Sequence, residues 1–240
     1  MHDLLRSLGA KLMKDEGIAF SEGQSKNMNP LMKVRRLSLS NKGDTLRLPS
    51  LIIEQKCLRV LQSFNSPEIK TIQDDIVKGL DRLRVLDLKY TSIKSLPNSI
   101  MKLLHLRYLD LDRTNIHKLP ESIGYLAYLQ TLNISGYESL HVLPNGITRL
   151  SNLRCLRVRD TPLTHVPSEI GRLTNLNHFE GFVVGQDDSP TDMVEGWNLE
   201  ELQSLSNLRH LDIWRSERAS TAGGTTILAN MIRLRRLDIF

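Results

Sequence analysis

Cysteine is scarce in this sequence, where Cys57 and Cys155 are the only two among 240 residues. Two isolated cysteines cannot build the disulfide framework of a small secreted domain, so they predict a reducing, cytoplasmic environment. Aromatic residues make up only 5% of the chain, against 40% for apolar residues as a whole. The chain can therefore bury a sizeable core, and that core must be mainly aliphatic.

Long apolar runs are also missing. No stretch of 18 consecutive apolar residues occurs, so we expect no membrane span. The first residues hold no signal-peptide core, because charged residues interrupt them at Asp3, Arg6, Lys11 and Lys14. Both absences favour a cytoplasmic location.

The net charge of +5 comes without a Lys/Arg block and without an aromatic stripe beside one. Nucleic acid is therefore a weak candidate partner. The phosphate-binding pattern G-x-x-x-x-G-K-[ST] is absent as well, so no nucleotide cofactor is expected in this chain. These absences leave protein binding as the favoured activity.

A six-residue phrase recurs through the chain and dominates its organisation. Its first leucines Leu83, Leu106, Leu129 and Leu153 are 23, 23 and 24 residues apart. The phrase occurs nine times, as VRRLSL 34–39, LRVLQS 58–63, LRVLDL 83–88, LRYLDL 106–111, LQTLNI 129–134, LRCLRV 153–158, LNHFEG 176–181, LRHLDI 208–213 and LRRLDI 234–239. Periods of this length indicate a stacked-repeat architecture.

A second phrase follows four of these strands: IKSLPNSI 93–100, IHKLPESI 116–123, LHVLPNGI 140–147 and LTHVPSEI 163–170. Proline cannot donate to a strand ladder, so Pro97, Pro120, Pro144 and Pro167 predict the end of extended chain and the start of a helical or turn-like return. The layout is that of leucine-rich repeats. We expect an α/β solenoid, with a curved parallel sheet on the concave side and irregular or helical segments on the convex side.

Two features modify this solenoid. The usual turn asparagine is replaced by Thr91, Thr114 and Thr161, with Tyr137 in the longer unit. A gap of 32 residues separates Leu176 from Leu208, and its polar stretch predicts an inserted loop near 183–199. We assign residues 31–240 to about nine repeats without a C-terminal cap, and residues 1–30 to a helical stub and linker.

Residues on the concave face would form three rows across neighbouring strands. The first row runs Arg36, Val60, Val85, Tyr108, Thr131, Cys155, His178, His210 and Arg236. The second runs Ser38, Gln62, Asp87, Asp110, Asn133, Arg157, Glu180, Asp212 and Asp238. The third runs Ser40, Phe64, Lys89, Asp112, Ser135, Arg159, Phe182, Trp214 and Phe240. From these rows we take as candidate partner-binding residues Asp87, Tyr108, Asp110, Asp112, Arg157, Arg159, His178, His210, Asp212 and Trp214. Trp, Tyr and Arg are the residue types that most often anchor protein interfaces.

Catalytic and metal-binding alternatives are weaker. Cys155, His178 and His210 lie side by side in the first row, but no local C-x-x-C or H-x-x-x-H spacing supports zinc. A thiol nucleophile would need a substrate pocket that nothing in the sequence indicates. Carboxylates on an open, solvated surface are unlikely to have tuned pKa values. We therefore expect no enzyme activity in this chain.

The repeats resemble those of plant intracellular immune receptors of the nucleotide-binding leucine-rich-repeat class, in particular the coiled-coil branch. The resemblance is carried by the LPxxI repeat type, VRRLSLS 34–40, CLRVLQS 57–63 before LRVLDLKYTSIKSLPNSI 83–100, and NLNHFEGFVVGQDD 175–188 before LEELQSLSNLRHLDI 199–213. The opening MHDLLRSLGAKLMKDEG 1–17 resembles the Met-His-Asp motif that ends the switch module of this class.

The resemblance implies that His2 corresponds to a residue that contacts bound ADP, although the rest of that nucleotide pocket is missing here. It implies a recognition module that senses a pathogen effector or a modified host protein and restrains the nucleotide switch in plant defence. A stand-alone cytosolic scaffold of the Ras-associated repeat type is an alternative, and a repeat-bearing ligase or phosphatase subunit is another. A phosphate-binding loop encoded upstream of Met1 would favour the receptor.

Overall fold

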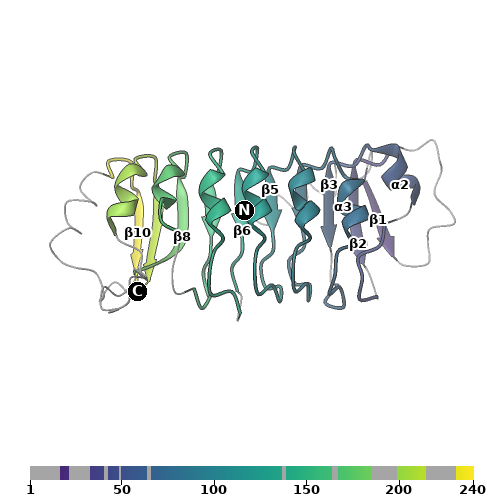
Figure 1. The fold of residues 1–240 in the computed structure, drawn as a ribbon, viewed down its shortest axis with the longest axis horizontal. Helices are drawn as coiled ribbons and strands as arrows, with labels where there is room; N and C mark the ends of the chain where they lie inside the picture. The colour runs from purple at the N-terminus through teal and green to yellow at the C-terminus, as the bar shows by residue number, and fades with distance from the viewer. Residues whose placement is uncertain are drawn as a thin grey trace.

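The recurring strand phrases form one parallel sheet in the computed structural model, which describes residues 17–21, 33–40, 43–48, 50–63, 66–136, 139–163, 167–184, 199–214 and 231–240. The strands are β1 (Gly17–Ser21), β2 (Arg36–Ser40), β3 (Val60–Ser63), β4 (Val85–Asp87), β5 (Tyr108–Asp110), β6 (Thr131–Asn133), β7 (Cys155–Arg157), β8 (His178–Val183), β9 (His210–Trp214) and β10 (Arg236–Ile239). They lie side by side in chain order, and all ten pair in parallel (Figure 1).

Short helices connect the strands: α2 (Ser50–Gln55), α3 (Asp74–Lys78) and the 3₁₀ helices η2 (Asn98–Lys102), η3 (Glu121–Tyr125), η4 (Asn145–Arg149), η5 (Ile170–Arg172) and η6 (Leu199–Ser204). They lie on one side of the sheet (Figure 1). The predicted leucine-rich-repeat solenoid, with a parallel sheet and a largely helical return side, is therefore confirmed. The other side of the sheet carries the strand side chains that point away from the core, and we call it the open face.

Strand β1 is the one strand that the repeated phrase does not predict. Its Ile18 and Phe20 are paired in register with Leu37 and Leu39 of β2. The sheet thus begins before residue 31, the position at which we expect the repeats to start. The predicted N-terminal helix, His2 and the inserted loop at 185–198 lie outside the described residues, as does Tyr137.

The leucines of each phrase form the core. Within the 83–88 phrase, Leu83, Leu86 and Leu88 have exposed fractions of 0%, 3% and 0%, as their alternation predicts. One hydrophobic cluster runs through all the repeats and includes the isoleucines and leucines of the return segments. Each buried side chain of this kind stabilises the fold by about 1.5–3 kcal/mol. The burial is shared between neighbouring repeats, so it exists only in the stack.

The return segments begin where the prolines predict. Pro97, Pro120 and Pro144 are extended residues that directly precede η2, η3 and η4. Their missing N–H is no loss at a helix start, where it would have no intrahelical partner. Glu121 extends this arrangement to the next repeat, because its carboxylate accepts the backbone N–H groups of Asn145 and Gly146 at 3.1 and 2.7 Å.

The turn after each strand has a regular structure. Tyr90, Arg113 and Asp160 occupy the left-handed region with φ of 58°, 51° and 53°, and Gly136 takes the equivalent place with 71°. The next residue is threonine in three of these repeats, and the Thr91 and Thr161 hydroxyls donate to the carbonyls of Leu88 and Val158, each at 2.7 Å. Threonine here therefore satisfies a buried backbone carbonyl, which is the role expected of the turn position.

No helix among the described residues is long and apolar enough to cross a membrane.

Gly124 and Gly146 bring η3 and η4 into backbone contact, which generates a test of the stacking. A Cβ added to Gly124 would lie 2.3 Å from the carbonyl oxygen of Gly146. Neither the added Cβ nor the carbonyl oxygen can rotate away, because each is fixed by its own backbone. The repeats must therefore separate to relieve the clash. We expect Gly124→Ala to destabilise the fold by about 1–3 kcal/mol, measured as a lower thermal midpoint. Ser151→Ala, on an exposed turn, is the control, and equal midpoints for both variants would contradict the account.

Candidate protein-binding face

The open face has the row structure that the sequence predicts over most of its length. The first row follows strand register from Arg36 on β2 to His210 and Arg236 on β9 and β10. The second row follows it from Ser38 through Asp87, Asp110, Asn133, Arg157 and Glu180. Residues that are 23–32 positions apart in the sequence are therefore direct neighbours.

The third row departs from prediction at β8. Phe179 pairs with Leu211, but Phe182 pairs with Ile213, so two residues of β8 stand opposite one residue of β9. This is a β-bulge, and Gly181 within it has a φ of 92°. The predicted place of Phe182 on the concave face is wrong, because the bulge turns its ring into the core with 0% exposed. Predicted row member Phe64 lies outside the described residues.

Side-chain oxygens of the second row close the turns at the ends of β4, β5 and β6. Asp87, Asp110 and Asn133 each accept the backbone N–H two residues further on, at distances of 3.2, 3.0 and 3.2 Å. Such local bonds are a property of Asp and Asn. These carboxylates therefore have a structural function besides any contact with a partner.

Asp110 is the best-bonded of them. It accepts hydrogen bonds from the Tyr108 hydroxyl at 2.7 Å and from the Asn133 amide at 3.1 Å. The expectation of an open, solvated carboxylate is wrong here, because these groups enclose Asp110 and leave 4% of it exposed. Burial and the adjacent carboxylate raise the pKa of Tyr108. Burial also raises the pKa values of Asp87 and Asp112.

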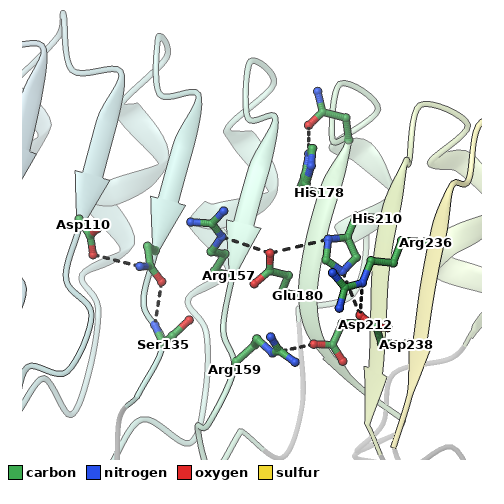
Figure 2. A network of polar contacts seen from close by, with 12 residues as sticks. Asp110, Ser135, Arg157, Arg159, His178, Glu180, His210, Asp212, Arg236 and Asp238 are labelled. Carbon is green, nitrogen blue, oxygen red and sulfur yellow. Dashed lines mark hydrogen bonds and ion pairs between the residues drawn. The ribbon is translucent and has the colours of Figure 1, made fainter. Parts of the chain in front are cut away.

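A chain of charged contacts crosses the four strands β7 to β10 (Figure 2). Glu180 Oε1 lies 3.3 Å from Arg157 Nε and 3.9 Å from His210 Nδ1. Asp238 Oδ2 lies 3.3 Å from His210 Nε2 and 2.8 Å from Arg236 Nε. Removal from solvent acts to raise the pKa of Asp238, but hydrogen bonds from His210 and Arg236 outweigh this and lower it. Acidic and basic side chains alternate along this chain of contacts and hold one another in place.

Asp212 is the most deeply buried charge on this face, with 0% exposed. Arg159 Nε lies 2.8 Å from its Oδ2, yet neither carboxylate oxygen is in hydrogen-bond geometry with any group of the described residues. Burial raises the pKa of Asp212, and the positive charge of Arg159 offsets this only in part. The solvated surface predicted for this carboxylate is therefore wrong as well, since Arg159 and Trp214 cover it.

Arg159 and Trp214 also form a cluster with Phe240 at one end of the open face. The Trp214 ring stacks on Phe240 with centroids 4.8 Å apart, and the Arg159 guanidinium lies 6.0 Å from the Phe240 ring centre. Phe240 is 54% exposed. A hollow of about 230 Å³ lies beside them, lined in part by Arg159, Gly181 and Trp214. It is large enough for one side chain of a partner.

Cys155, His178 and His210 are adjacent, as predicted, but their chemistry does not favour a metal or a nucleophile. His178 Nδ1 lies 2.7 Å from the Asn177 side-chain oxygen, and both His210 nitrogens face carboxylates. Burial raises the pKa of the Cys155 thiol, which disfavours the thiolate. Burial lowers the pKa of His178, aided by the neighbouring His210 and Arg157 charges. Within the described residues no group of three or more His, Cys, Asp or Glu could hold a metal ion.

The side chains of the open face are arranged in a way that favours binding a partner. Its side chains are fixed by mutual contacts, which lowers the entropy lost when a partner docks. The list of candidate residues from sequence omits Glu180, Asn133 and Asp238, although they occupy the same row as Asp110 and Asp212. Their row positions were the available signal, because Glu180 lies between Arg157 and His210, Asn133 bonds to Asp110, and Asp238 bonds to His210.

The ion pair between Arg159 and Asp212 generates a test of this face. Arg159→Ala leaves the buried Asp212 without its cation, so we expect a loss of about 1–3 kcal/mol of stability. The double variant Arg159→Ala/Asp212→Asn removes the stranded charge and should regain most of the loss. Denaturant unfolding measures both, and a double variant no more stable than the single one would contradict the pairing.

The raised pKa of Asp212 predicts a pH dependence. Protonation of Asp212 contributes to the free energy of unfolding because the folded state favours its neutral form. This stabilising contribution is complete at pH values below the ordinary pKa of 3.8 and is lost as the pH rises through the higher folded-state pKa. We therefore expect Asp212→Asn to gain stability relative to the natural chain as the pH is raised from about 4 towards neutrality. Thermal midpoints across this range measure the difference, and a constant or shrinking difference would contradict the burial.

The fold recurs in solved structures. A leucine-rich-repeat protein of Leptospira interrogans is 21% identical with a TM-score of 0.63, over 94% of this chain and 60% of that one. The ectodomain of the Arabidopsis thaliana receptor kinase GASSHO1/SCHENGEN3, in complex with CASPARIAN STRIP INTEGRITY FACTOR 2, is 19% identical with a TM-score of 0.61, over 93% and 29%. The Arabidopsis receptor kinase HAESA, in complex with the peptide hormone IDA and the co-receptor SERK1, is 20% identical with a TM-score of 0.65, over 89% and 35%.

The chain thus spans 60% or less of the length of these three proteins. No curated protein matches the sequence. The family model described as a leucine-rich repeat region matches residues 76–240, which is more than half of the chain. The ladder of leucines, the parallel strands and this match together place the chain in the leucine-rich repeat family.

Proposed function

We propose that the chain is the protein-recognition module of a plant intracellular immune receptor of the nucleotide-binding leucine-rich-repeat class, and that its open face contacts the partner. The observation that carries the binding role is the cluster of Trp214, Phe240 and Arg159 at one end of a face whose other polar groups are held in place, where Phe240 is exposed and Trp214 and Arg159 are half-buried. Trp and Arg are typical interface anchors. Leucine-rich repeats in general serve as binding scaffolds without enzyme activity.

The choice of this receptor class rests on the sequence. The LPxxI repeats, VRRLSLS 34–40 and the opening MHDLLRSLGA 1–10 support it. The partner is then a pathogen effector or a modified host protein in the cytoplasm. Binding would act by contacting two states of the receptor unequally, which shifts the equilibrium of its nucleotide switch. His2 would be the remnant of that switch, with no nucleotide bound by this chain.

Two of the structural relatives support a ligand-binding role for the face. GASSHO1/SCHENGEN3 was captured with CASPARIAN STRIP INTEGRITY FACTOR 2 and HAESA with a peptide hormone. The stand-alone scaffold remains the second candidate, because it shares the LPxxI repeat. A transcript that encodes G-x-x-x-x-G-K-[ST] upstream of Met1 would decide for the receptor, and an in-frame stop codon directly upstream would decide for the scaffold.

Affinity capture from leaf extract tests the binding face. The variant Trp214→Ala/Phe240→Ala removes the exposed stack, and we expect it to recover the specific partner at least ten-fold less than the natural chain. The control Tyr125→Ala/Val142→Ala removes two exposed side chains from the return segments and should leave recovery unchanged. Equal recovery with both variants would refute binding through the open face.

A further inference from the structure

One edge of the sheet carries a ladder of arginines that the sequence disperses. The residue directly before each strand from β3 to β10 donates its backbone N–H to the carbonyl of the equivalent residue in the preceding repeat. Arg84 donates to Arg59 at 2.7 Å, and Arg107 donates to Arg84 at 2.8 Å. These nine positions are Arg35, Arg59, Arg84, Arg107, Gln130, Arg154, Asn177, Arg209 and Arg235. Seven of the nine are therefore arginine and none is lysine.

The ladder is bordered by positions without acidic residues. In every repeat the two residues before the ladder position and the two after it include no Asp or Glu. Within the described part of the chain, Arg59, Arg84, Arg107, Arg154, Arg209 and Arg235 are exposed, and their side chains form neither ion pairs nor hydrogen bonds. Three arginines of the open face differ in this respect, because Arg157, Arg159 and Arg236 are all paired.

Unpaired like charges on neighbouring strands are unfavourable for folding. Adjacent strands are about 4.8 Å apart, and like charges directly opposite each other destabilise a sheet. Arg59, Arg84 and Arg107 directly precede three successive strands and are neighbours of this kind. Gln130 and Asn177 show that the ladder position accepts a neutral residue. The six exposed, unpaired arginines thus have no structural explanation within the described chain, and their planar forks suit a carboxylate or a phosphate.

We propose that this arginine ladder binds an acidic, extended segment of the protein partner, laid across the strands along the edge of the sheet. This inference rests on the proposed function, since it names the chemistry of the same partner. The ladder spans nine strands, or about 40 Å, which is the reach of about 12 extended residues. Carboxylates along such a segment would meet one guanidinium after another.

Charge on the neighbouring rows favours a narrow polypeptide over nucleic acid. Asp87 and Asp110 lie three residues along the strand from Arg84 and Arg107, which is about 10 Å. A polyanion wider than that spacing would overlie this acidic row and be repelled. The exposed aromatic rings near the edge already have a neighbour, with Tyr128 stacked on His105 at 6.4 Å and therefore less available to nucleotide bases.

Fluorescence anisotropy with a labelled peptide of 12 glutamates tests the ladder on the full 240-residue chain. We expect binding that weakens as salt is raised, and a dissociation constant at least ten-fold higher for Arg59→Gln/Arg84→Gln/Arg107→Gln. The matched control, Lys70→Gln/Lys94→Gln/Lys118→Gln, removes the same charge from exposed return-segment lysines and should change the constant less than two-fold. The ladder variant should keep or raise its thermal midpoint, because repulsion between arginines is removed.

Three results would overturn the proposal. Equal weakening by both triple variants would mean that only net charge matters. Tighter ladder-dependent binding of a 12-nucleotide oligothymidylate than of the glutamate peptide would assign the edge to nucleic acid. A lower midpoint of the ladder variant, with no change in peptide binding, would give the arginines a purely structural role. The variant Trp214→Ala/Phe240→Ala retains the ladder, so loss of the glutamate peptide and loss of the captured partner can be told apart.

Discussion

The stacking of one repeat on the next is the constraint on which the rest of this structure depends. No single repeat can bury its leucines, so core, sheet and return helices exist only when neighbours are present. The same stacking places side chains from distant parts of the sequence 4.8 Å or so apart along rows. Gly124 in η3 and Gly146 in η4 show how closely neighbouring repeats approach, because their backbones are in contact. Every functional row described above follows from it.

The open face and the arginine edge have opposite electrostatic character. On the open face carboxylates are bonded to turns, to Tyr108 or to arginines, and they are more buried than surface acids usually are. At the edge, Arg59, Arg84, Arg107, Arg154, Arg209 and Arg235 form no ion pair or side-chain hydrogen bond within the described residues. A face with internally satisfied charges is rigid and suited to shape recognition, whereas an edge with unsatisfied charges attracts a partner of opposite sign.

The sequence predicts the fold well because the leucine period determines both strands and register. The nine phrases correspond to β2–β10, and the prolines mark the return helices. The features that the sequence could not predict arise from local deviations from the leucine period. The bulge at Gly181, which sends Phe182 into the core, requires knowledge of which strands pair. The burial of Asp110 and Asp212 depends on neighbours 23 and 53 residues away, and strand β1 lacks the repeated phrase.

The central claim, that the open face contacts a protein partner, is tested most directly by site-specific photo-cross-linking in plant cells. A photoreactive amino acid at position 214 would report on the open face, and the same group at position 125 would report on the return segments. The account predicts a discrete protein adduct from position 214 and none from position 125. Adducts of equal yield from both positions, or from position 125 alone, would contradict it.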